Sequence, residues 1–325
     1  MNQALEFDIL CALKKHADDV KAVLYIQQKG IISCSRDGQI ILWELDYKDA
    51  LYPSITGCES VKDIQLYHIK NVFLNCLANV SINNNLPVLL CGGSDCNIRS
   101  IDLSNNNVEL FAKAHSNNVC SLTVNPVDSN EFISTSWDNT CLIWSFKEKK
   151  ALFTIATKDT PIWCCAYSPD AEWLLLGSAD KSIDCCKRKK SLLILQFTHY
   201  NAHEDCVRAI TFLDNDVFVS ASNDGNLITW RLSKQTNDIV RLRVFTQHTN
   251  MIFTMAYAFE RLATAGEDMS VKIWSYDGND KLKVLKLLDT VQLPVETCWN
   301  VCWINKDTFA ASLRLEILID RNKIF

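Results

Sequence analysis

The sequence is poor in the segments that build nucleotide-binding and hydrolytic sites. Only 9 of its 325 residues are glycine, and it contains no phosphate-binding glycine loop, no GxSxG motif and no HExxH motif. None of its 15 cysteines forms a CxxC pair, the usual start of a structural zinc site. His199, His203 and Cys206 are spaced so that a helix would gather them, but the residues after Cys206 are predicted to form a strand. We therefore expect no metal and no cofactor.

The net charge and the hydropathy of the sequence also argue against a nucleic-acid-binding, a membrane-spanning or a secreted protein. The net charge is -5, whereas nucleic-acid binding usually requires a basic surface, so no nucleic-acid partner is expected. No stretch reaches 18 apolar residues, so no membrane span is expected. Residues 1–16 lack the basic and apolar regions of a signal peptide. The odd cysteine number, without a paired secretory framework, favours a reducing compartment, the cytosol or the nucleus.

The sequence does contain a repeat in which an Asp is followed six residues later by Trp or by another large apolar or sulfur-containing residue. The six pairs are Asp37/Trp43, Asp95/Ile101, Asp138/Trp144, Asp180/Cys186, Asp224/Trp230 and Asp268/Trp274. From Asp95 onward, successive Asp residues stand 42 to 44 positions apart, and Leu313 with Ile319 forms a degenerate seventh slot. This period, with a Ser-rich strand before the Asp and a Trp on the following strand, is typical of a β-propeller. We predict an all-β, seven-bladed WD40 β-propeller.

Each repeat is predicted to form four short strands, because no window favours helical periodicity over strand alternation. In the third repeat the expected strands are 119–124, 131–136, 140–146 and 151–155. The seventh repeat has only three strands, and Phe7–Leu13 belongs to no repeat, so we expect Phe7–Leu13 to complete the seventh blade. Residues 1–325 are thus predicted to be a single propeller, with blades at about 14–54, 66–112, 113–156, 157–199, 200–246, 247–290, and 291–325 plus 6–13.

Five of the six histidines occupy one slot of the repeat: His16, His68, His115, His203 and His248. With the nearby Ser and Asp they resemble the catalytic trio of a hydrolase, but a catalytic trio occurs once, whereas these residues recur with the fold. We interpret them as a buried relay in which the Trp indole donates to a Ser hydroxyl and the Asp holds the imidazole. No catalytic residue is expected, and the protein is predicted not to be an enzyme. The residues assigned to the structural repeat are His16, Asp37, Trp43, His115, Asp138, Trp144, Asp180, His203, Asp224, Trp230, His248, Asp268 and Trp274.

Two sets of positions are expected to share one face of the propeller, at the starts of the inner strands and just before each repeat Asp. The inner-strand positions are Lys21, Phe73, Cys120, Trp163, Arg208, Phe253 and Trp299. A single aromatic there could merely plug the channel, but these four aromatics and Trp137 of the other set, with several cations, are typical of a binding surface. The predicted binding residues are Arg36, Phe73, Trp137, Trp163, Arg208, Asn223, Phe253, Glu267 and Trp299.

Several strings are more specific than a generic repeat, among them HSNNVCSL (115–122), STSWDNTCLIW (134–144), HEDCVRAI (203–210), SASNDGNLITW (220–230) and LPVETCWNVC (293–302). In these strings the chain resembles the N-terminal propeller of the phospholipase A-2-activating protein family. The resemblance implies a non-enzymatic adaptor of the ubiquitin–proteasome or ubiquitin-recycling pathway that binds ubiquitin through the aromatic-rich top face. The alternative is a general WD-repeat scaffold without ubiquitin binding.

The chain also departs from the family. The sequence ends with the propeller, so the valosin-containing-protein AAA segregase is expected as a partner only if the family's C-terminal domains exist. The fourth repeat has Lys158 in place of His and Cys186 in place of Trp, and the seventh has Leu313 in place of Asp. We expect the fold to tolerate these weaker repeats.

Overall fold

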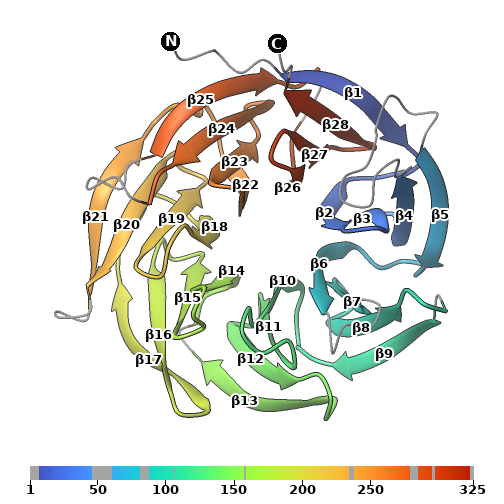
Figure 1. The fold of residues 1–325 in the computed structure, drawn as a ribbon. Helices are drawn as coiled ribbons and strands as arrows, with labels where there is room; N and C mark the ends of the chain where they lie inside the picture. The colour runs from blue at the N-terminus through green and yellow to red at the C-terminus, as the bar shows by residue number, and fades with distance from the viewer. Residues whose placement is uncertain are drawn as a thin grey trace. The chain divides into compact units, whose positions relative to one another are not determined.

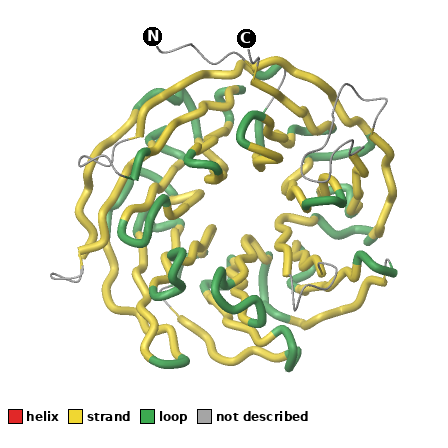
Figure 2. The backbone as a smooth tube through the Cα atoms, in the orientation of Figure 1, coloured by secondary structure: helices red, strands yellow, loops and turns green. Residues whose placement is uncertain are grey.

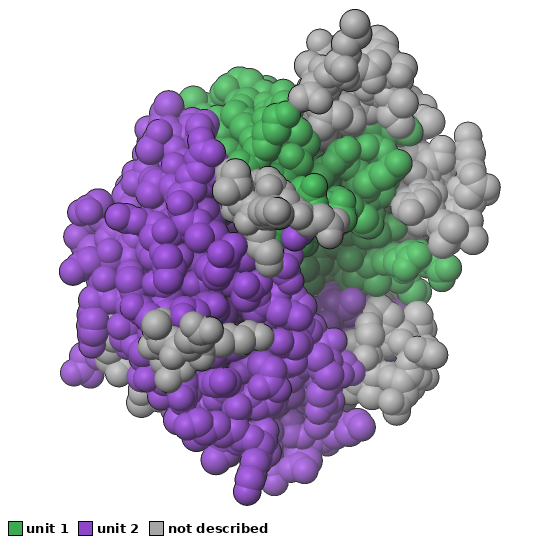
Figure 3. Space-filling view, turned by 60° about the vertical axis from the view of Figure 1, so that its left-hand side comes forward, with its two compact units in different colours: residues 1–74, 253–277, 285–325 green, residues 75–252, 278–284 purple. Residues whose placement is uncertain are grey.

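The computed structural model describes residues 7–45, 61–80, 88–105, 107–156, 159–233, 238–278, 285–294 and 297–322. These ranges consist of strands and loops and contain no helix (Figure 2), and hence none that could cross a membrane. Their strands form seven four-stranded sheets (Figure 1). The chain divides into two compact units, residues 1–74, 253–277 and 285–325 and residues 75–252 and 278–284 (Figure 3).

The first unit contains three sheets. One comprises β2 (Val20–Ile26), β3 (Gly30–Ser35), β4 (Gln39–Leu45) and β5 (Val61–His68). Another comprises β22 (Ile252–Ala258), β23 (Arg261–Gly266), β24 (Ser270–Tyr276) and β25 (Leu285–Gln292). The third comprises β26 (Asn300–Asn305), β27 (Thr308–Ser312), β28 (Glu316–Asn322) and β1 (Phe7–Lys14).

The third of these sheets joins the two ends of the described chain. Strand β1 runs antiparallel to β28, with Cys11 opposite Ile319 and Leu13 opposite Ile317. Cys11, Leu13 and their partners are buried in one apolar cluster. The prediction that Phe7–Leu13 completes the seventh blade is therefore confirmed.

The second unit contains four sheets, each in sequence order. The first comprises β6 (Leu74–Val80), β7 (Val88–Gly93), β8 (Asn97–Asp102) and β9 (Asn107–Lys113). The next comprises β10 (Val119–Val124), β11 (Glu131–Ser136), β12 (Thr140–Ser145) and β13 (Lys150–Ala156). The remaining two comprise β14 (Ile162–Tyr167), β15 (Trp173–Ser178), β16 (Ile183–Lys189) and β17 (Leu192–His199), and β18 (Val207–Phe212), β19 (Val217–Ser222), β20 (Leu227–Ser233) and β21 (Asp238–Phe245).

The second strand of a sheet is the most deeply buried. Every residue of β3, β11, β15 and β19 is buried, which explains why these segments are nearly continuous runs of apolar residues and Ser rather than alternating ones. The expected start of the second blade at residue 66 falls inside β5, which pairs with β4 and so belongs to the first sheet.

Candidate functional site

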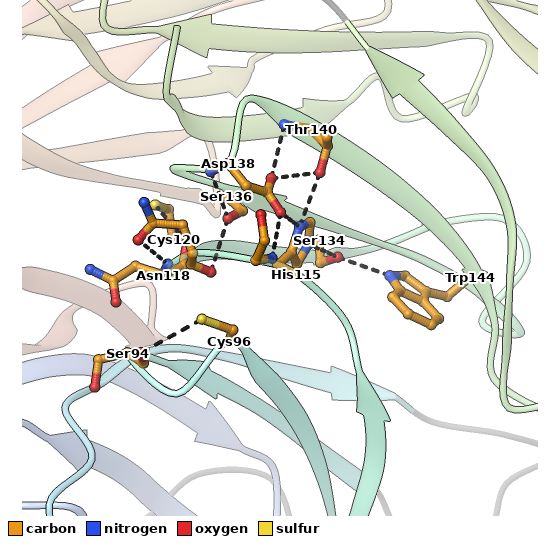
Figure 4. A network of polar contacts seen from close by, with 12 residues as sticks. Ser94, Cys96, His115, Asn118, Cys120, Ser134, Ser136, Asp138, Thr140 and Trp144 are labelled. Carbon is orange, nitrogen blue, oxygen red and sulfur yellow. Dashed lines mark hydrogen bonds and ion pairs between the residues drawn. The ribbon is translucent and has the colours of Figure 1, made fainter. Parts of the chain in front are cut away.

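The polar relay of the sheet β10–β13 shows how the repeat residues are used (Figure 4). The Trp144 indole N–H donates to Ser134 Oγ at 2.8 Å. Ser134 Oγ lies 2.7 Å from His115 Nε2, and His115 Nδ1 lies 2.9 Å from Asp138 Oδ2. A neutral imidazole protonated on Nδ1 satisfies these contacts, because Ser134 can then donate to Nε2 while Nδ1–H donates to Asp138. The four groups satisfy one another, and none is left as a nucleophile or a base.

The same relay recurs in other sheets. In β2–β5, Trp43 Nε1 and His16 Nε2 each lie 2.8 Å from Ser33 Oγ, and His16 Nδ1 lies 3.0 Å from Asp37 Oδ2. The corresponding residues of β18–β21 are Trp230, Ser220, His203 and Asp224. In β22–β25, the Trp274 indole donates to the Thr264 hydroxyl at 2.9 Å, and His248 is buried. A geometry that recurs from sheet to sheet supports the fold rather than one reaction.

The relay carboxylates are held in their ionised form. Burial by itself raises the pKa of Asp224, but hydrogen bonds from His203 and from the backbone amides of Glu204 and Asn226 outweigh it and lower the pKa to about 2. Hydrogen bonds likewise outweigh burial at Asp37 and Asp138 and lower their pKa values. Burial lowers the pKa of His115, which favours the neutral imidazole.

Three sheets lack the complete relay and have other groups in its place. In β6–β9, Asp95 accepts hydrogen bonds from Asn97 and Arg99. His68 was expected in the relay but is the exposed last residue of β5, so that expectation was wrong: its backbone pairs with β4, which leaves the side chain at the surface.

The sheet β14–β17 exchanges the relay for apolar contacts. Buried Leu176 and Cys186 stand where other sheets have the Ser and the Trp, and Lys158 lies outside the described residues. Asp180 still accepts hydrogen bonds from the backbone and hydroxyl of Ser182. In the sheet of β1 and β26–β28, the Asp slot is filled by buried Leu313.

Four of the seven inner-strand positions lie at irregularities of the sheets. In four sheets the pairing of the first strand with the second skips one residue, namely Lys21, Cys120, Trp163 or Arg208. Such a β-bulge leaves the extra residue unpaired and redirects its side chain. The residue before the repeat Asp then donates its backbone N–H to the carbonyl two residues before the bulge, as Asn223 does to Cys206 at 3.2 Å. The two positions chosen from sequence are therefore neighbours within a sheet.

In the second unit these positions bring several of the predicted residues together. The rings of Trp137 and Trp163 meet edge to face, with centroids 5.1 Å apart. The guanidinium carbon of Arg208 lies 4.0 Å from the centre of the Trp163 ring. The backbone N–H of Asn223 donates to the carbonyl of Cys206, two residues before Arg208. Trp137 is 37% exposed. The Trp163 indole nitrogen and Asn223 Oδ1 are buried and have no hydrogen-bond partner. We call Trp137, Trp163, Arg208 and Asn223 the tryptophan–arginine cluster.

A second cluster lies in the first unit. Phe253 and Trp299 stack with centroids 5.0 Å apart. The Lys21 ammonium lies 2.9 Å from the centre of the Trp299 ring, and the Arg36 guanidinium carbon lies 5.6 Å from it. Arg36 also pairs with Asp19 at 3.0 Å. We call Lys21, Arg36, Phe253 and Trp299 the Trp299 cluster. In the tryptophan–arginine cluster the cation of β18 covers a ring of β14, and in the Trp299 cluster the cation of β2 covers a ring that lies just before β26.

Two predicted residues are not among those whose contacts define the clusters. Phe73 precedes β6 and is 53% exposed, and Glu267 follows β23 and is partly buried. Sequence reasoning in turn missed Asp19 and Asp205, whose charges act on Arg36 and Arg208. Both could have been found from the sequence, because each is an acidic residue two or three positions before the inner-strand position of its sheet.

Thiols near the tryptophan–arginine cluster are not reactive nucleophiles. Burial raises the pKa of Cys120 and of Cys164 far above the usual value, so both remain protonated. No disulfide joins the cysteines that the structure describes. Within the described ranges no group of three or more His, Cys, Asp or Glu is placed to hold a metal ion.

The family model for the WD domain, G-beta repeat, matches residues 7–44, 107–145, 149–184, 195–231 and 239–275, more than half of the chain. The chain therefore belongs to the WD-repeat family, and its fold class is the predicted seven-bladed β-propeller.

Similarity to individual proteins narrows the assignment within the WD-repeat family. The chain is 26% identical over 300 residues to the ubiquitin homeostasis protein lub1 of Schizosaccharomyces pombe, covering 91% of this chain and 37% of the relative. It is 27% identical over 330 residues to the ubiquitin fusion degradation protein 3 homolog of Caenorhabditis elegans, covering 98% of this chain and 36% of the relative. The crystal structure of the WD40 β-propeller domain of Doa1 matches with a TM-score of 0.79 and 24% identity over 98% of both chains.

These matches confirm the resemblance to the phospholipase A-2-activating protein family over nearly the whole chain. The chain spans about a third of the length of these curated relatives.

Proposed function

We propose that this chain is a ubiquitin-binding adaptor module of the ubiquitin–proteasome or ubiquitin-recycling pathway, and that it acts by binding rather than by catalysis. The observation that carries the proposal is the similarity, over nearly the whole chain, to relatives named for ubiquitin homeostasis and ubiquitin fusion degradation. The relays support a non-enzymatic role, because their Ser, His and Asp groups are committed to one another.

The aromatic clusters are the proposed contacts. Ubiquitin presents a small apolar patch surrounded by basic residues, and the exposed edge of Trp137 with the Trp163 ring offers an apolar surface for that patch. The Trp299 cluster offers a second aromatic surface in the first unit. There Phe73 adds an exposed ring, and Glu267 supplies a carboxylate for a basic residue.

The same proposal also concerns one further partner and the cellular compartment in which the chain acts. The valosin-containing-protein AAA segregase is proposed as a partner only if C-terminal domains accompany the propeller. The lack of disulfides among the described cysteines suits the reducing cytosol or nucleus.

Titration of 15N-labelled ubiquitin with the 325-residue chain, followed by NMR, tests the proposal. We expect a dissociation constant of about 10–500 μM, because one propeller face buries an interface at the small end of the range. Replacing both Trp137 and Trp163 with Ala should weaken binding by at least roughly 10-fold, since central aromatics dominate such interfaces. Tyr200→Ala is the matched control, because Tyr200 is an aromatic of the same unit that is 66% exposed outside the cluster.

Unchanged affinity in the Trp137→Ala/Trp163→Ala variant would refute the site. Absence of binding by the unmodified chain would refute the function and favour the general scaffold.

A further inference from the structure

The outer strand β17 lacks the charges that protect the outer strands of the other sheets. Charged side chains on an unpaired strand edge prevent it from pairing with a strand of another molecule. The outer strands of the other six sheets, β1, β5, β9, β13, β21 and β25, each contain at least one Asp, Glu, Lys or Arg. β17 (LLILQFTH) contains none. It pairs with β16 on one side, and no described strand pairs with its other edge, so this edge can accept an added strand (Figure 1).

Apolar side chains are exposed along the first half of β17. Leu193 is buried and Leu195 packs against the same apolar cluster, whereas Leu192 and Ile194 are 48% and 40% exposed. Residues two apart on a strand share one face, so Leu192 and Ile194 form one apolar surface. Gln196 is skipped in the pairing with β16, so the regular part of the edge covers residues 192–195. It fits a short extended segment with apolar side chains.

The strand and the turn beside this edge are basic. In the register of β16 and β17, Lys187 stands opposite Ile194 and Lys189 stands opposite Leu192. Opposite residues of an antiparallel pair lie on the same face of the sheet. Lys190 follows in the turn that joins the two strands, and both Lys189 and Lys190 are exposed. The apolar surface therefore has cations along one side.

These lysines lack a carboxylate partner among the described residues. Arg188, in the same run of basic residues, pairs with Glu131. Within the described ranges, Lys187, Lys189 and Lys190 have no ion pair. A strand added to β17 would lie about 10 Å from β16, two strand spacings away, a distance that extended Lys and Glu side chains can bridge. An acidic residue on that strand would supply the missing charge.

We infer that the outer edge of β17 is a docking site for a short extended segment of another protein, rich in acidic and apolar residues. The segment adds to the sheet as a fifth strand, with its apolar side chains on Leu192 and Ile194 and its carboxylates near Lys189 and Lys190. A second copy of this chain fits this edge poorly, because residues 187–199 contain four cations and no carboxylate. The edge contains none of the residues proposed to bind ubiquitin, so the inference holds whether or not ubiquitin binds.

A peptide titration tests the chemistry of the partner. The fluorescence anisotropy of a labelled eight-residue peptide of alternating Val and Glu is followed as the 325-residue chain is added. We expect a dissociation constant of about 0.1–1 mM, because so short an edge buries less than a standard interface. Binding should weaken at least roughly 3-fold when NaCl is raised from about 50 to about 300 mM.

Two control peptides separate charge from apolar contact. A Val–Lys peptide has the opposite charge, and a Ser–Glu peptide lacks the apolar side chains. Both should bind at least roughly 10-fold more weakly than the Val–Glu peptide. Equal binding of the three peptides, or no binding of the Val–Glu peptide, would overturn the inference.

Variants of the chain test whether the peptide binds at β17. Ile194→Lys adds a charge to the edge and should weaken binding at least roughly 10-fold. Leu110→Lys is the matched control, because Leu110 is 53% exposed on β9, the outer strand of another sheet in the same unit. Lys189→Glu combined with Lys190→Glu should reverse the preference, so that the Val–Lys peptide binds more tightly than the Val–Glu peptide. Equal effects of Ile194→Lys and Leu110→Lys, or an unchanged preference in the double variant, would exclude β17 as the site.

Sedimentation velocity tests the other occupant of the edge. We expect the unmodified chain to remain monomeric from about 10 to about 200 μM. A dimer that dissociates in Ile194→Lys would assign the edge to a second copy of the chain and overturn the acidic partner.

Discussion

Ser134 Oγ lies 2.7 Å from the imidazole of His115 and also accepts the indole N–H of Trp144. This one hydroxyl therefore connects the second strand of its sheet to the third strand and to the loop before the first. The next residue, Thr135, is equally buried, but its hydroxyl has no hydrogen-bond partner. We therefore expect these two adjacent buried hydroxyls to have opposite effects on stability.

Ser134→Ala should lower the free energy of unfolding by about 2–4 kcal/mol, because it strands both the Trp144 N–H and the His115 nitrogen in the core. Thr135→Val should change it by less than about 0.5 kcal/mol or raise it by up to about 1 kcal/mol, since it replaces an unsatisfied hydroxyl with a methyl of similar shape. Urea unfolding followed by Trp fluorescence measures both. Equal destabilisation by the two substitutions would contradict the relay.

Acid should destabilise the fold through the relay carboxylates. The pKa of Asp224 is about 2 in the folded protein and 3.8 ordinarily, so its contribution of roughly 2 kcal/mol is complete above pH 4 and is lost as the pH falls towards 2. The lowered pKa of His115 acts in the same direction at higher pH, because the unfolded chain takes up its proton first below about 6.5. Unfolding midpoints at pH 7, 5 and 3 should therefore decrease, and Asp224→Asn should flatten the lower part of the curve. A midpoint that rises on acidification would refute this linkage.

The fold was largely predictable because its pattern is short-range. In the third repeat the predicted strand 119–124 is identical to β10 and 131–136 is identical to β11. The Asp turn marks the boundary between the second and third strands, and apolar runs mark the strands themselves. The outer strand β5 was less predictable: its position depends on pairing with β4, as in the pair Trp43 and Asp63, rather than on its own sequence.

The sequence was enough to predict which positions form the candidate site, but not which of their side chains contact one another. Counting from the repeat selected Trp163 and Arg208 as equivalent residues of successive sheets. That the Arg208 guanidinium covers the Trp163 ring depends on how those two sheets pack and on the bulge in each first strand. Neither the hydropathy nor the spacing of the residues predicts this packing or these bulges. The lack of a hydrogen-bond partner at the Trp163 N–H follows from the same packing.

A buried ion pair should compensate for the relay that β14–β17 lacks. Glu131 on β11 accepts hydrogen bonds from Arg188 at 3.2 Å, from the Tyr167 hydroxyl and from Asn125 at 2.9 Å, and so ties two sheets of the second unit together. Arg188→Met should lower the free energy of unfolding by roughly 2–4 kcal/mol, because it leaves the Glu131 charge largely buried without its cation.

Two further variants test that explanation. Glu131→Gln added to Arg188→Met should recover part of the loss, since it removes the unpaired charge. Lys149→Met breaks an exposed pair with Glu109, whose side chains are 57% and 51% exposed, and should cost less than about 1 kcal/mol. If Arg188→Met costs no more than this control, the pair does not hold the two sheets together.

The N-terminal strand β1 should stabilise the fold through one of its faces only. Leu13 is 5% exposed and packs in the cluster formed with β28, whereas Ile9 on the same strand is 43% exposed. Leu13→Ala should cost about 2–4 kcal/mol of unfolding free energy because it opens a cavity in that cluster, while Ile9→Ala should cost less than about 1 kcal/mol. Native-state hydrogen exchange should also show faster exchange of the amides of β28 in Leu13→Ala, because β28 depends on β1 for its outer ladder of hydrogen bonds. Equal effects of the two substitutions would mean that β1 adds only backbone pairing to the seventh blade.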